Sequence, residues 1–384
     1  MVADAVLTWA GNISSSKPDS NDNDGLWTSL YIAAECFRYA ATHSPDALRN
    51  AQDSLKGLYR LLSITGISGF PARSYIHRNE RGDTDGMWHW VPDHMRKWKG
   101  DTSSDELVGH FFVYGIAYDL LPSEDESDRE AIRNAAVNVA NNLREHGWNL
   151  AGYGGRITTW GRFSLAYFKT TLGHEDAPLN SLELLFMLRV AYHVSGDRSF
   201  LEAYQRLIKQ DGYLPRVTEG FSKLPPLTHF NFSDEELAFL SFYPVLQYED
   251  GPGFRRLYQA ALTNLWRHAE GEHNPLWDYV YNVGTGAENY DAQGALDTLR
   301  RIPMDMIYWT VHNSQRLDLP LSQLPNEAGQ RQSLKVIPPG ERCISKWNTN
   351  PYALDGNSGG KRVDDGTYFL LPYWLRRYYR LVGP

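Results

Sequence analysis

The sequence predicts an all-α fold in which paired helices close into a ring, and three observations support this fold class. Hydrophobic residues recur with helical spacing along most of the 384 residues, and the alternating pattern of strands is rare. Stretches that are apolar nearly all round alternate about six times with amphipathic stretches, which predicts buried helices each followed by a surface helix. The last predicted helix is as apolar as the middle ones, whereas a linear stack of helix pairs would need polar end caps.

The polar stretch 1–24 is predicted to be an N-terminal arm or linker, and 25–384 a single ring-shaped domain, because the chain is too long for one small core. The segment 304–315 is the expected outer partner of the last inner helix. The remaining outer helices follow their inner partners after short turns rich in Ser, Asp, Gly and Pro. The predicted inner helices are 26–41, 104–121, 179–195, 234–248, 274–282 and 366–381.

Composition and motif searches exclude several classes of function. The net charge of −8 and the pI of about 5.8 argue against nucleic acid as a partner. No apolar run approaches the roughly 18 residues that span a membrane. No secretory signal is visible, and the compartment stays open. The oligomeric state also stays open. The two cysteines form no CxxC pair and no phosphate-binding loop occurs, so we expect neither a metal nor a cofactor.

The hairpin pattern, the acidic helix starts DELVGH (105–110) and DEELAF (234–239), and the aromatic loops together resemble the six-hairpin glycosidase-like superfamily. The resemblance covers almost the whole chain and is architectural; it matches no single family. It implies an (α/α)6 toroid with long aromatic-rich loops. Members of that superfamily are glycoside hydrolases, polysaccharide lyases and a few epimerases, with sites at the open end of the ring. The 12 Trp and 23 Tyr suit a sugar-binding surface, since their rings pair a flat apolar face with a polar edge.

Two helix starts match each other and supply the catalytic hypothesis. Ser103-x-x-Glu106 and Ser233-x-x-Glu236 both read as capping boxes, which would occupy Glu106 and Glu236. Asp105 and Glu235 are then left to face the ring as the carboxylate pair that glycoside hydrolysis requires. We expect Glu235 to be the acid and Asp105 the base or nucleophile. The alternative is that acidic residues at these helix starts are only caps.

The long loops supply the predicted substrate-binding residues. The loop 71–106 and the hairpin 152–163 are dense in aromatic and cationic residues, and Arg binds carboxylates in a bidentate manner, which favours an anionic sugar. The alternative is that these cations form surface salt bridges. His89 and His94 do not form a metal-binding frame, because Pro92 interrupts any helix between them. The predicted substrate-binding residues are Asp24, Arg73, His77, Trp88, His89, Trp98, Lys99, Arg156, Trp160, Arg162, His229, Asn231, Asn274, Trp347, Asn348 and Asp365.

The leading functional hypothesis is a glycoside hydrolase that acts on a uronic-acid-containing or otherwise anionic oligo- or polysaccharide. One alternative is a polysaccharide lyase that removes a proton beside a uronate carboxylate. A third possibility is a toroid that binds glycans without catalysis. The residues that would serve a lyase, as base or as neutralising group, are His77, His89, His229, Tyr153, Arg156 and Asn231.

Overall fold

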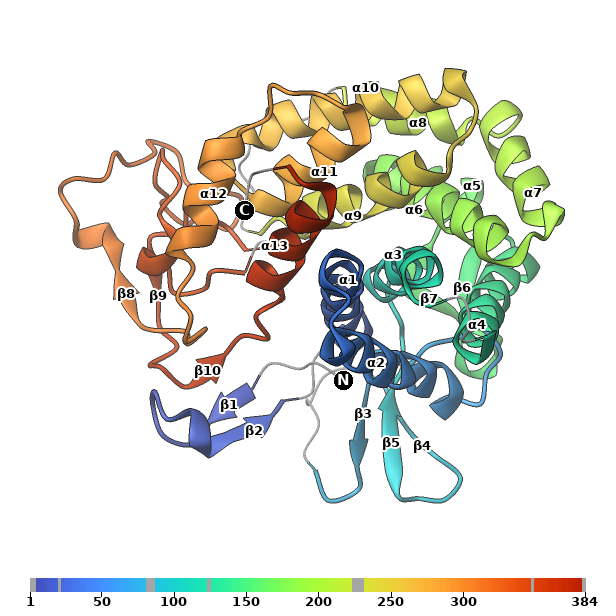
Figure 1. The fold of residues 1–384 in the computed structure, drawn as a ribbon, viewed down its shortest axis with the longest axis horizontal. Helices are drawn as coiled ribbons and strands as arrows, with labels where there is room; N and C mark the ends of the chain where they lie inside the picture. Colours follow the sequence, from blue (N-terminus) through green and yellow to red (C-terminus); the bar gives the residue numbers. More distant parts are fainter. Residues whose placement is uncertain are drawn as a thin grey trace.

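The computed structural model describes residues 5–19, 22–80, 87–122, 126–222, 231–346 and 349–381. Within these ranges the protein is mostly helical, with thirteen α-helices and short strands grouped in four small antiparallel sheets. The predicted helical class is therefore confirmed. Figure 1 shows the helices packed together, with three of the sheets at the lower and left edges and the β6–β7 sheet (149–162) on the right, beside α4 (Glu126–Glu145). None of the described helices is long and apolar enough to cross a membrane.

Six buried helices occupy the centre, and each packs against the next (Figure 1). The last of them also packs against the first, and α3 touches α9 across the middle. All six inner helices that the sequence predicted are present, although the third begins earlier than residue 179 and contains Pro178. They are α1 (Asp24–Thr42), α3 (Ser104–Leu120), α6 (Thr171–Ser195), α9 (Ser233–Tyr248), α11 (Pro275–Thr285) and α13 (Thr367–Tyr379).

The outer helices pack beside the inner ones. They are α2 (Pro45–Ile64), α4 (Glu126–Glu145), α7 (Arg198–Lys209), α8 (Tyr213–Gly220), α10 (Pro252–Ala269) and α12 (Ala292–Arg301), with the short α5 (Leu165–Phe168) leading into α6. The predicted outer helix at 304–315 is wrong. That segment contains strand β8 (Val311–His312), which pairs with β9 (Asp355–Gly356). The run from Ile307 to Val311 is β-branched and aromatic, which favours extended backbone.

The remaining strands form three small sheets that hold the loops in place. The predicted N-terminal arm is tied to the C-terminal loops, because β1 (Ala5–Leu7) pairs with both β2 (Ser16–Pro18) and β10 (Arg362–Val363). The long loop after α2 contains the sheet of β3 (Ser74–His77), β5 (Arg96–Lys99) and β4 (Trp88–Trp90). A hairpin of β6 (Asn149–Ala151) and β7 (Ile157–Arg162) follows α4.

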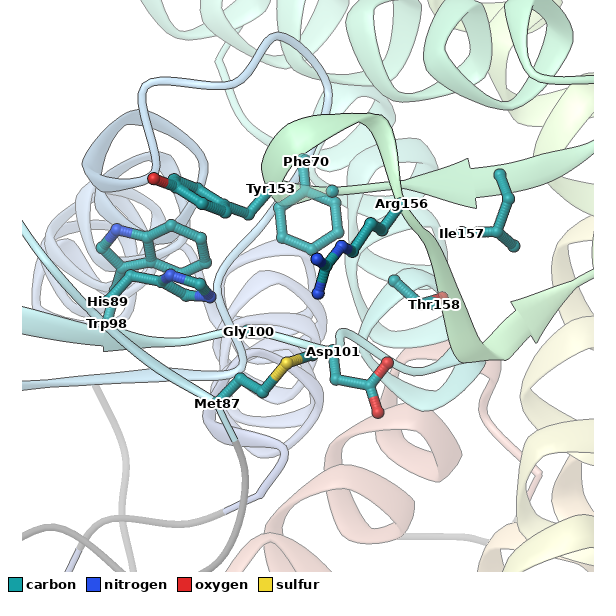
Figure 2. A pocket seen from close by; sticks show the side chains of 11 residues that line it. Phe70, Met87, His89, Trp98, Gly100, Asp101, Tyr153, Arg156, Ile157 and Thr158 are labelled. Atoms are coloured by element: carbon teal, nitrogen blue, oxygen red, sulfur yellow. The ribbon is translucent and has the colours of Figure 1, made fainter.

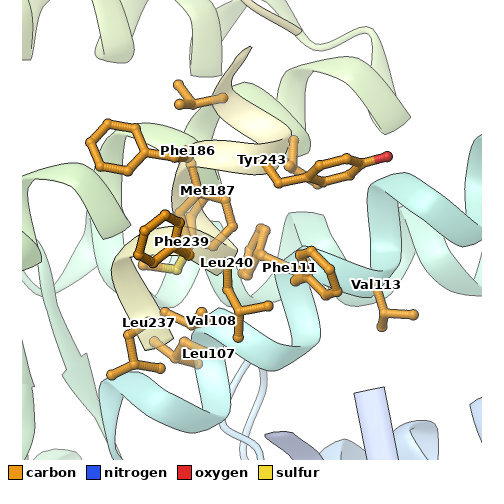
Figure 3. Close-up of a cluster of buried hydrophobic side chains, with 14 of the residues drawn as sticks. Leu107, Val108, Phe111, Val113, Phe186, Met187, Leu237, Phe239, Leu240 and Tyr243 are labelled. Atoms are coloured by element: carbon orange, nitrogen blue, oxygen red, sulfur yellow. The ribbon is translucent and has the colours of Figure 1, made fainter. Parts of the chain in front are cut away.

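The core between α3, α6 and α9 is filled by large apolar side chains. Phe111, Phe186 and Phe239 meet there, and all three are fully buried (Figure 3). On the other side of α3, glycines let α1 approach closely. A Cβ on Gly109 would lie 2.5 Å from the Cα of Leu26. This close approach brings the start of α1 against the start of α3, where the polar residues of the candidate site lie.

Candidate active site at the starts of the inner helices

The predicted capping box at the start of α3 does not form. Ser103 occupies the N-cap position without capping the helix, and its hydroxyl instead contacts the side-chain oxygen of Asn23. Glu106 turns towards α1, where its Oε1 accepts the Gly25 amide at 3.0 Å. Its Oε2 lies 3.6 Å from Nε2 of His110. Gly25 of α1 can approach Glu106 and His110 this closely only because it has no side chain. A Cβ at this position would lie 2.8 Å from the His110 ring.

The second predicted capping box, at the start of α9, is also absent. The helix begins at Ser233 itself, so Phe232 occupies the N-cap position and no side chain caps the helix. Glu236 is therefore not used as a capping residue. It is buried, and its Oε1 has no hydrogen-bond partner. Glu235 is also buried, and it lies beside Glu272, whose pKa it helps to raise after the larger effect of burial.

A third buried carboxyl group comes from α6. Glu183 is fully buried, and neither of its carboxyl oxygens makes a hydrogen bond of normal geometry, although Ser104 is close enough to lower its pKa slightly. Sequence reasoning did not single out this residue. The available signal was a single Glu inside the otherwise apolar stretch 182–188, and a buried carboxyl group with no partner of normal geometry among the described residues calls for an explanation.

Burial raises the pKa values of Glu106, Glu183 and Glu236 well above their ordinary range. Asp105, which is half-buried, raises the pKa of each of them further. Its carboxylate therefore lies near all three groups, at the point where α3, α6 and α9 come together. Buried carboxyl groups with raised pKa values beside a more exposed carboxyl group form the kind of environment in which acid and base roles separate.

We call Asp105, Glu106, Glu183 and Glu236 the carboxyl cluster, and Lys346 supplies a positive charge beside it. Its Nζ lies 3.4 Å from Asp364, 3.5 Å from Asp365 and 3.7 Å from the ring centre of Trp27. It is buried, and it lowers the pKa of Glu236, although burial has the larger opposite effect. Asp365, one of the predicted residues, accepts hydrogen bonds from the amide and hydroxyl of Thr367. Sequence reasoning missed Lys346, because a single lysine in a long loop carries no local signal.

Some predicted binding residues instead secure the start of α1. Asp24 is buried and accepts the Ser74 hydroxyl at 2.5 Å. Arg73 donates to the backbone oxygen of Asp22 at 2.6 Å, and Lys99 contacts the Asp22 carboxylate. These contacts pin the β3–β5 sheet against α1, beside the carboxyl cluster. The charges of Arg73 and Lys99 are thus engaged by the protein itself.

Other predicted residues lie away from the cluster. His77 is exposed at the end of β3, and Trp160 is half exposed on β7. Arg162 donates to the backbone oxygen of Thr158 at 2.9 Å. Asn274 caps α11, accepting the amide of Leu276 at 3.1 Å. Trp88 is half-buried on β4, about 6.0 Å from Nζ of Lys99. Three further predictions, His229, Trp347 and Asn348, lie outside the described residues.

The structure contains two cavities of interest, and neither is lined by Asp105, Glu106, Glu183 or Glu236. One, of about 620 Å³, is lined by the C-terminal loops and includes the predicted residue Asn231 together with Tyr308 and Arg342. The hydroxyl of Tyr308 donates to Asp364 at 3.1 Å, which connects this cavity to the carboxyl cluster. The other, of about 50 Å³, contains Arg156 (Figure 2).

The smaller cavity brings together three of the predicted binding residues, His89, Trp98 and Arg156. Arg162 is not among the residues that line this cavity, and its guanidinium folds back onto its own hairpin. Neither Asp105 nor Glu235 lines this cavity. In the part of the chain that the structure describes, no group of three or more His, Cys, Asp or Glu residues is placed to hold a metal ion.

Comparisons with known proteins give no family. No family model matches the chain, and no curated protein matches it. A crystal structure of a sugar epimerase from a ruminal bacterium is 11% identical, with a TM-score of 0.47, over 99% of this chain and 92% of that chain. A Bacteroides ovatus GH9 structure is 12% identical, with a TM-score of 0.46, over 96% of this chain and 73% of that chain. At values this low, neither likeness defines the reaction of this chain.

Proposed function

We propose that the chain is an (α/α)6 toroid enzyme that acts on an anionic oligo- or polysaccharide, with the carboxyl cluster as its catalytic centre. The cyclic packing of the six inner helices, with α13 against α1, supports the toroid. The cluster supports the choice of site, since strongly perturbed carboxyl groups are concentrated at functional positions in proteins.

The observation that carries the proposal is the contrast between Glu236 and Asp105. Burial favours the protonated form of Glu236, while Lys346 beside it favours the carboxylate that it becomes after giving up a proton. Asp105 is less buried and lies near it. In glycoside hydrolysis, Glu236 would protonate the leaving glycosidic oxygen, and Asp105 would activate water or attack the anomeric carbon. Glu235, the acid that the sequence suggested, stays the alternative partner of Asp105.

The surroundings suit a sugar with negative charge. The larger cavity has a volume in the range of ordinary ligand sites. Its lining combines amide side chains, the Tyr308 ring and two arginines, Arg342 and Arg362. Amides bind hydroxyl groups, an aromatic ring packs against sugar C–H faces, and arginine pairs with carboxylates. The cavity is therefore proposed to hold the substrate beside the cluster.

A second candidate is a polysaccharide lyase. It is favoured by one observation, the presence of His89, Tyr153 and Arg156 in one cavity (Figure 2). Burial lowers the pKa of His89, so the imidazole is neutral and able to accept a proton. Arg156 would then neutralise the uronate carboxylate. Elimination leaves an unsaturated sugar, whereas hydrolysis does not.

The deciding experiment is incubation of the purified protein with a panel of uronate-containing and neutral oligosaccharides. New reducing ends without ultraviolet absorbance are the expected result and mean hydrolysis. An unsaturated, absorbing product would support the lyase instead. Saturable binding with neither product would point to a non-catalytic glycan-binding protein. The Asp105→Asn variant is the control, because a contaminating activity would survive it.

A further inference from the structure

The smaller cavity is built by two stretches distant in the sequence, 87–101 and 152–158, together with Phe70. The β4–β5 hairpin contributes His89 and Trp98, the turn after β5 contributes Asp101, and the loop between β6 and β7 contributes Tyr153 and Arg156 (Figure 2). The loop between β6 and β7 can lie close against Phe70 because residue 152 is glycine. A Cβ at Gly152 would lie 2.6 Å from the ring of Phe70, which also lines the cavity.

One wall of this cavity is a stack of three rings. The His89 ring lies between the Trp98 ring, at 4.3 Å, and the Tyr153 ring, at 4.5 Å, with both pairs tilted by only 29°. Trp98 is buried, whereas Tyr153 is 63% exposed. The stack is therefore anchored at its inner end and presents an aromatic surface to solvent at its outer end. Such surfaces pack against the apolar faces of sugar rings.

The opposite side carries one positive and one negative group. The Arg156 guanidinium reaches into the cavity on the same side as Asp101 (Figure 2), and it makes no hydrogen bond or ion pair with the part of the protein that the structure describes. The Asp101 carboxylate is fixed, since it accepts the amide of Thr159 at 2.7 Å. An unpaired guanidinium beside aromatic rings is suited to bind a carboxylate. The neighbouring Asp101 suits a hydroxyl donor.

The size of the cavity limits what it holds. A volume of about 50 Å³ admits a group such as a carboxylate with an adjacent hydroxyl, but not a whole sugar ring, given that one water takes about 30 Å³ in the liquid. The body of the sugar would remain outside, against Tyr153. Asp101 precedes Asp105 by four residues, so the two lie within about 14 Å of each other. A sugar chain that reaches Asp105 can therefore also reach this cavity.

We propose that this cavity is an accessory subsite for one uronate unit of the substrate chain, with the carboxylate on Arg156, a ring hydroxyl on Asp101 and the sugar face against Tyr153. The inference rests on the proposed function, because it assumes a saccharide substrate. It goes further by naming the uronate as the unit recognised, and by separating the residues that recognise it from those of the carboxyl cluster.

The test is a binding titration followed by NMR, with glucuronate and galacturonate as anionic probes and glucose as the neutral probe. The variants are Arg156→Gln and, as a matched control, Arg96→Gln, which removes a charge from strand β5 without touching the cavity. We expect Arg156→Gln to weaken uronate binding by about tenfold or more, as befits a lost charged hydrogen bond. Glucose binding should not change, and the control should behave as the wild type.

Two results would overturn the subsite. One is uronate binding that is unchanged in Arg156→Gln, and the other is an equal loss for glucose and uronate in a variant whose thermal unfolding matches the wild type. The binding test can succeed or fail independently of the activity test for the proposed function, because binding is measured without turnover. Arg156-dependent uronate binding in a protein that yields no product would remove the catalytic proposal and leave the subsite standing.

Discussion

At the scale of single residues, the unusual feature of this protein is the number of carboxyl groups that it buries. Glu106 and Glu236 both come from helix starts, but neither caps its own helix. Glu183 lies well inside α6 and has no hydrogen bond of normal geometry. A buried carboxyl group without partners costs folding free energy. Its presence is explained if the group is needed in its protonated form for chemistry.

The assignment of the catalytic pair is tested by three conservative substitutions. Asp105→Asn and Glu236→Gln should each lower kcat by about 10²–10⁴-fold, which is the usual contribution of an acid or base. Glu235→Gln should have a smaller effect, because the proposal assigns the proton donor to Glu236, the carboxyl group whose pKa Lys346 lowers against the larger effect of burial. The measurement is turnover on the oligosaccharide that gives product. Loss of activity in Glu235→Gln with activity retained in Glu236→Gln would restore the pair suggested by the sequence.

The buried imidazole of His110 should make the stability depend on pH. Burial lowers the pKa of His110 from its ordinary 6.5 to about 3. Between these values the unfolded chain binds a proton that the folded chain does not, so the free energy of unfolding falls as the pH falls. One group contributes at most about 1.4 kcal/mol per pH unit. Burial raises the pKa of Glu106 above its ordinary value of 4.5. Above pH 4.5 the folded chain therefore binds a proton that the unfolded chain does not, so this carboxyl group makes the free energy of unfolding rise as the pH falls.

The His110 contribution is isolated by comparing slopes. In urea unfolding between about pH 4 and 6, the His110→Gln variant should show a shallower loss of stability towards acid than the wild type. The exposed His77 supplies the control, and His77→Gln should keep the wild-type slope. Equal slopes in all three proteins would mean that His110 takes up its proton in the folded state.

At the scale of elements, the decisive contact is that between α1 and α3. It brings the Gly25 amide to Glu106 and so places the first carboxyl group of the cluster. The approach depends on the absence of side chains at Gly25 and Gly109. On the opposite side α3 packs against α6 and α9 through Phe111, Phe186 and Phe239 (Figure 3). Helix α3 is thus held from both sides, which suits a helix that carries Asp105.

The closeness of α1 and α3 is tested by Gly109→Ala. The new methyl group would meet the backbone of Leu26 at 2.5 Å, so the helices must separate. We expect a loss of about 1–3 kcal/mol in the free energy of unfolding, as for other overpacked sites. Gly253→Ala in α10 is the matched control, because nothing lies within 4 Å of a Cβ there. It should be neutral or stabilise by up to about 1 kcal/mol. Similar losses in both variants would exclude the packing explanation.

At the scale of the whole molecule, the two ends of the chain meet twice. Helix α13 packs against α1, and β10 pairs with β1 (Figure 1). An ion pair at 2.7 Å between Asp19 and Arg362 reinforces the second contact. Phe37 of α1 lies against Tyr243 of α9 and against Tyr378 and Tyr379 of α13. Closure therefore depends on contacts between residues more than two hundred positions apart in the chain.

The packing of α13 against α1 should make the six inner helices unfold as one unit. Phe37→Ala removes a fully buried ring of α1 that contacts two other inner helices, α9 and α13, and it should cost about 3–5 kcal/mol. Thermal unfolding followed by near- and far-ultraviolet circular dichroism should show one transition at a lower temperature. Leu257→Ala, at a side chain that is 45% exposed, should change stability by less than about 0.5 kcal/mol. Two separate transitions would show that the halves of the ring unfold independently.

The sequence by itself determined the inner helices and their order. A buried helix is apolar on all sides over a dozen or more residues, and that pattern is local, so all six were predicted correctly apart from their ends. It also determined which loops carry aromatic and cationic residues. His89, Trp98 and Arg156 were named from composition alone, and they meet in one cavity.

Only the tertiary structure decided which carboxyl groups face the cluster. The spacing of Ser103 and Glu106 fits a capping box, but the Gly25 amide offers Glu106 a partner from α1 instead. In the same way Lys346 acquires its role from Asp364, Asp365 and Trp27, three residues brought to it by the fold. Helical periodicity depends on neighbours within a few residues in the chain, and it can therefore be predicted from the sequence. The protonation and partners of a buried charge depend on neighbours in space, which exist only once the ring has closed.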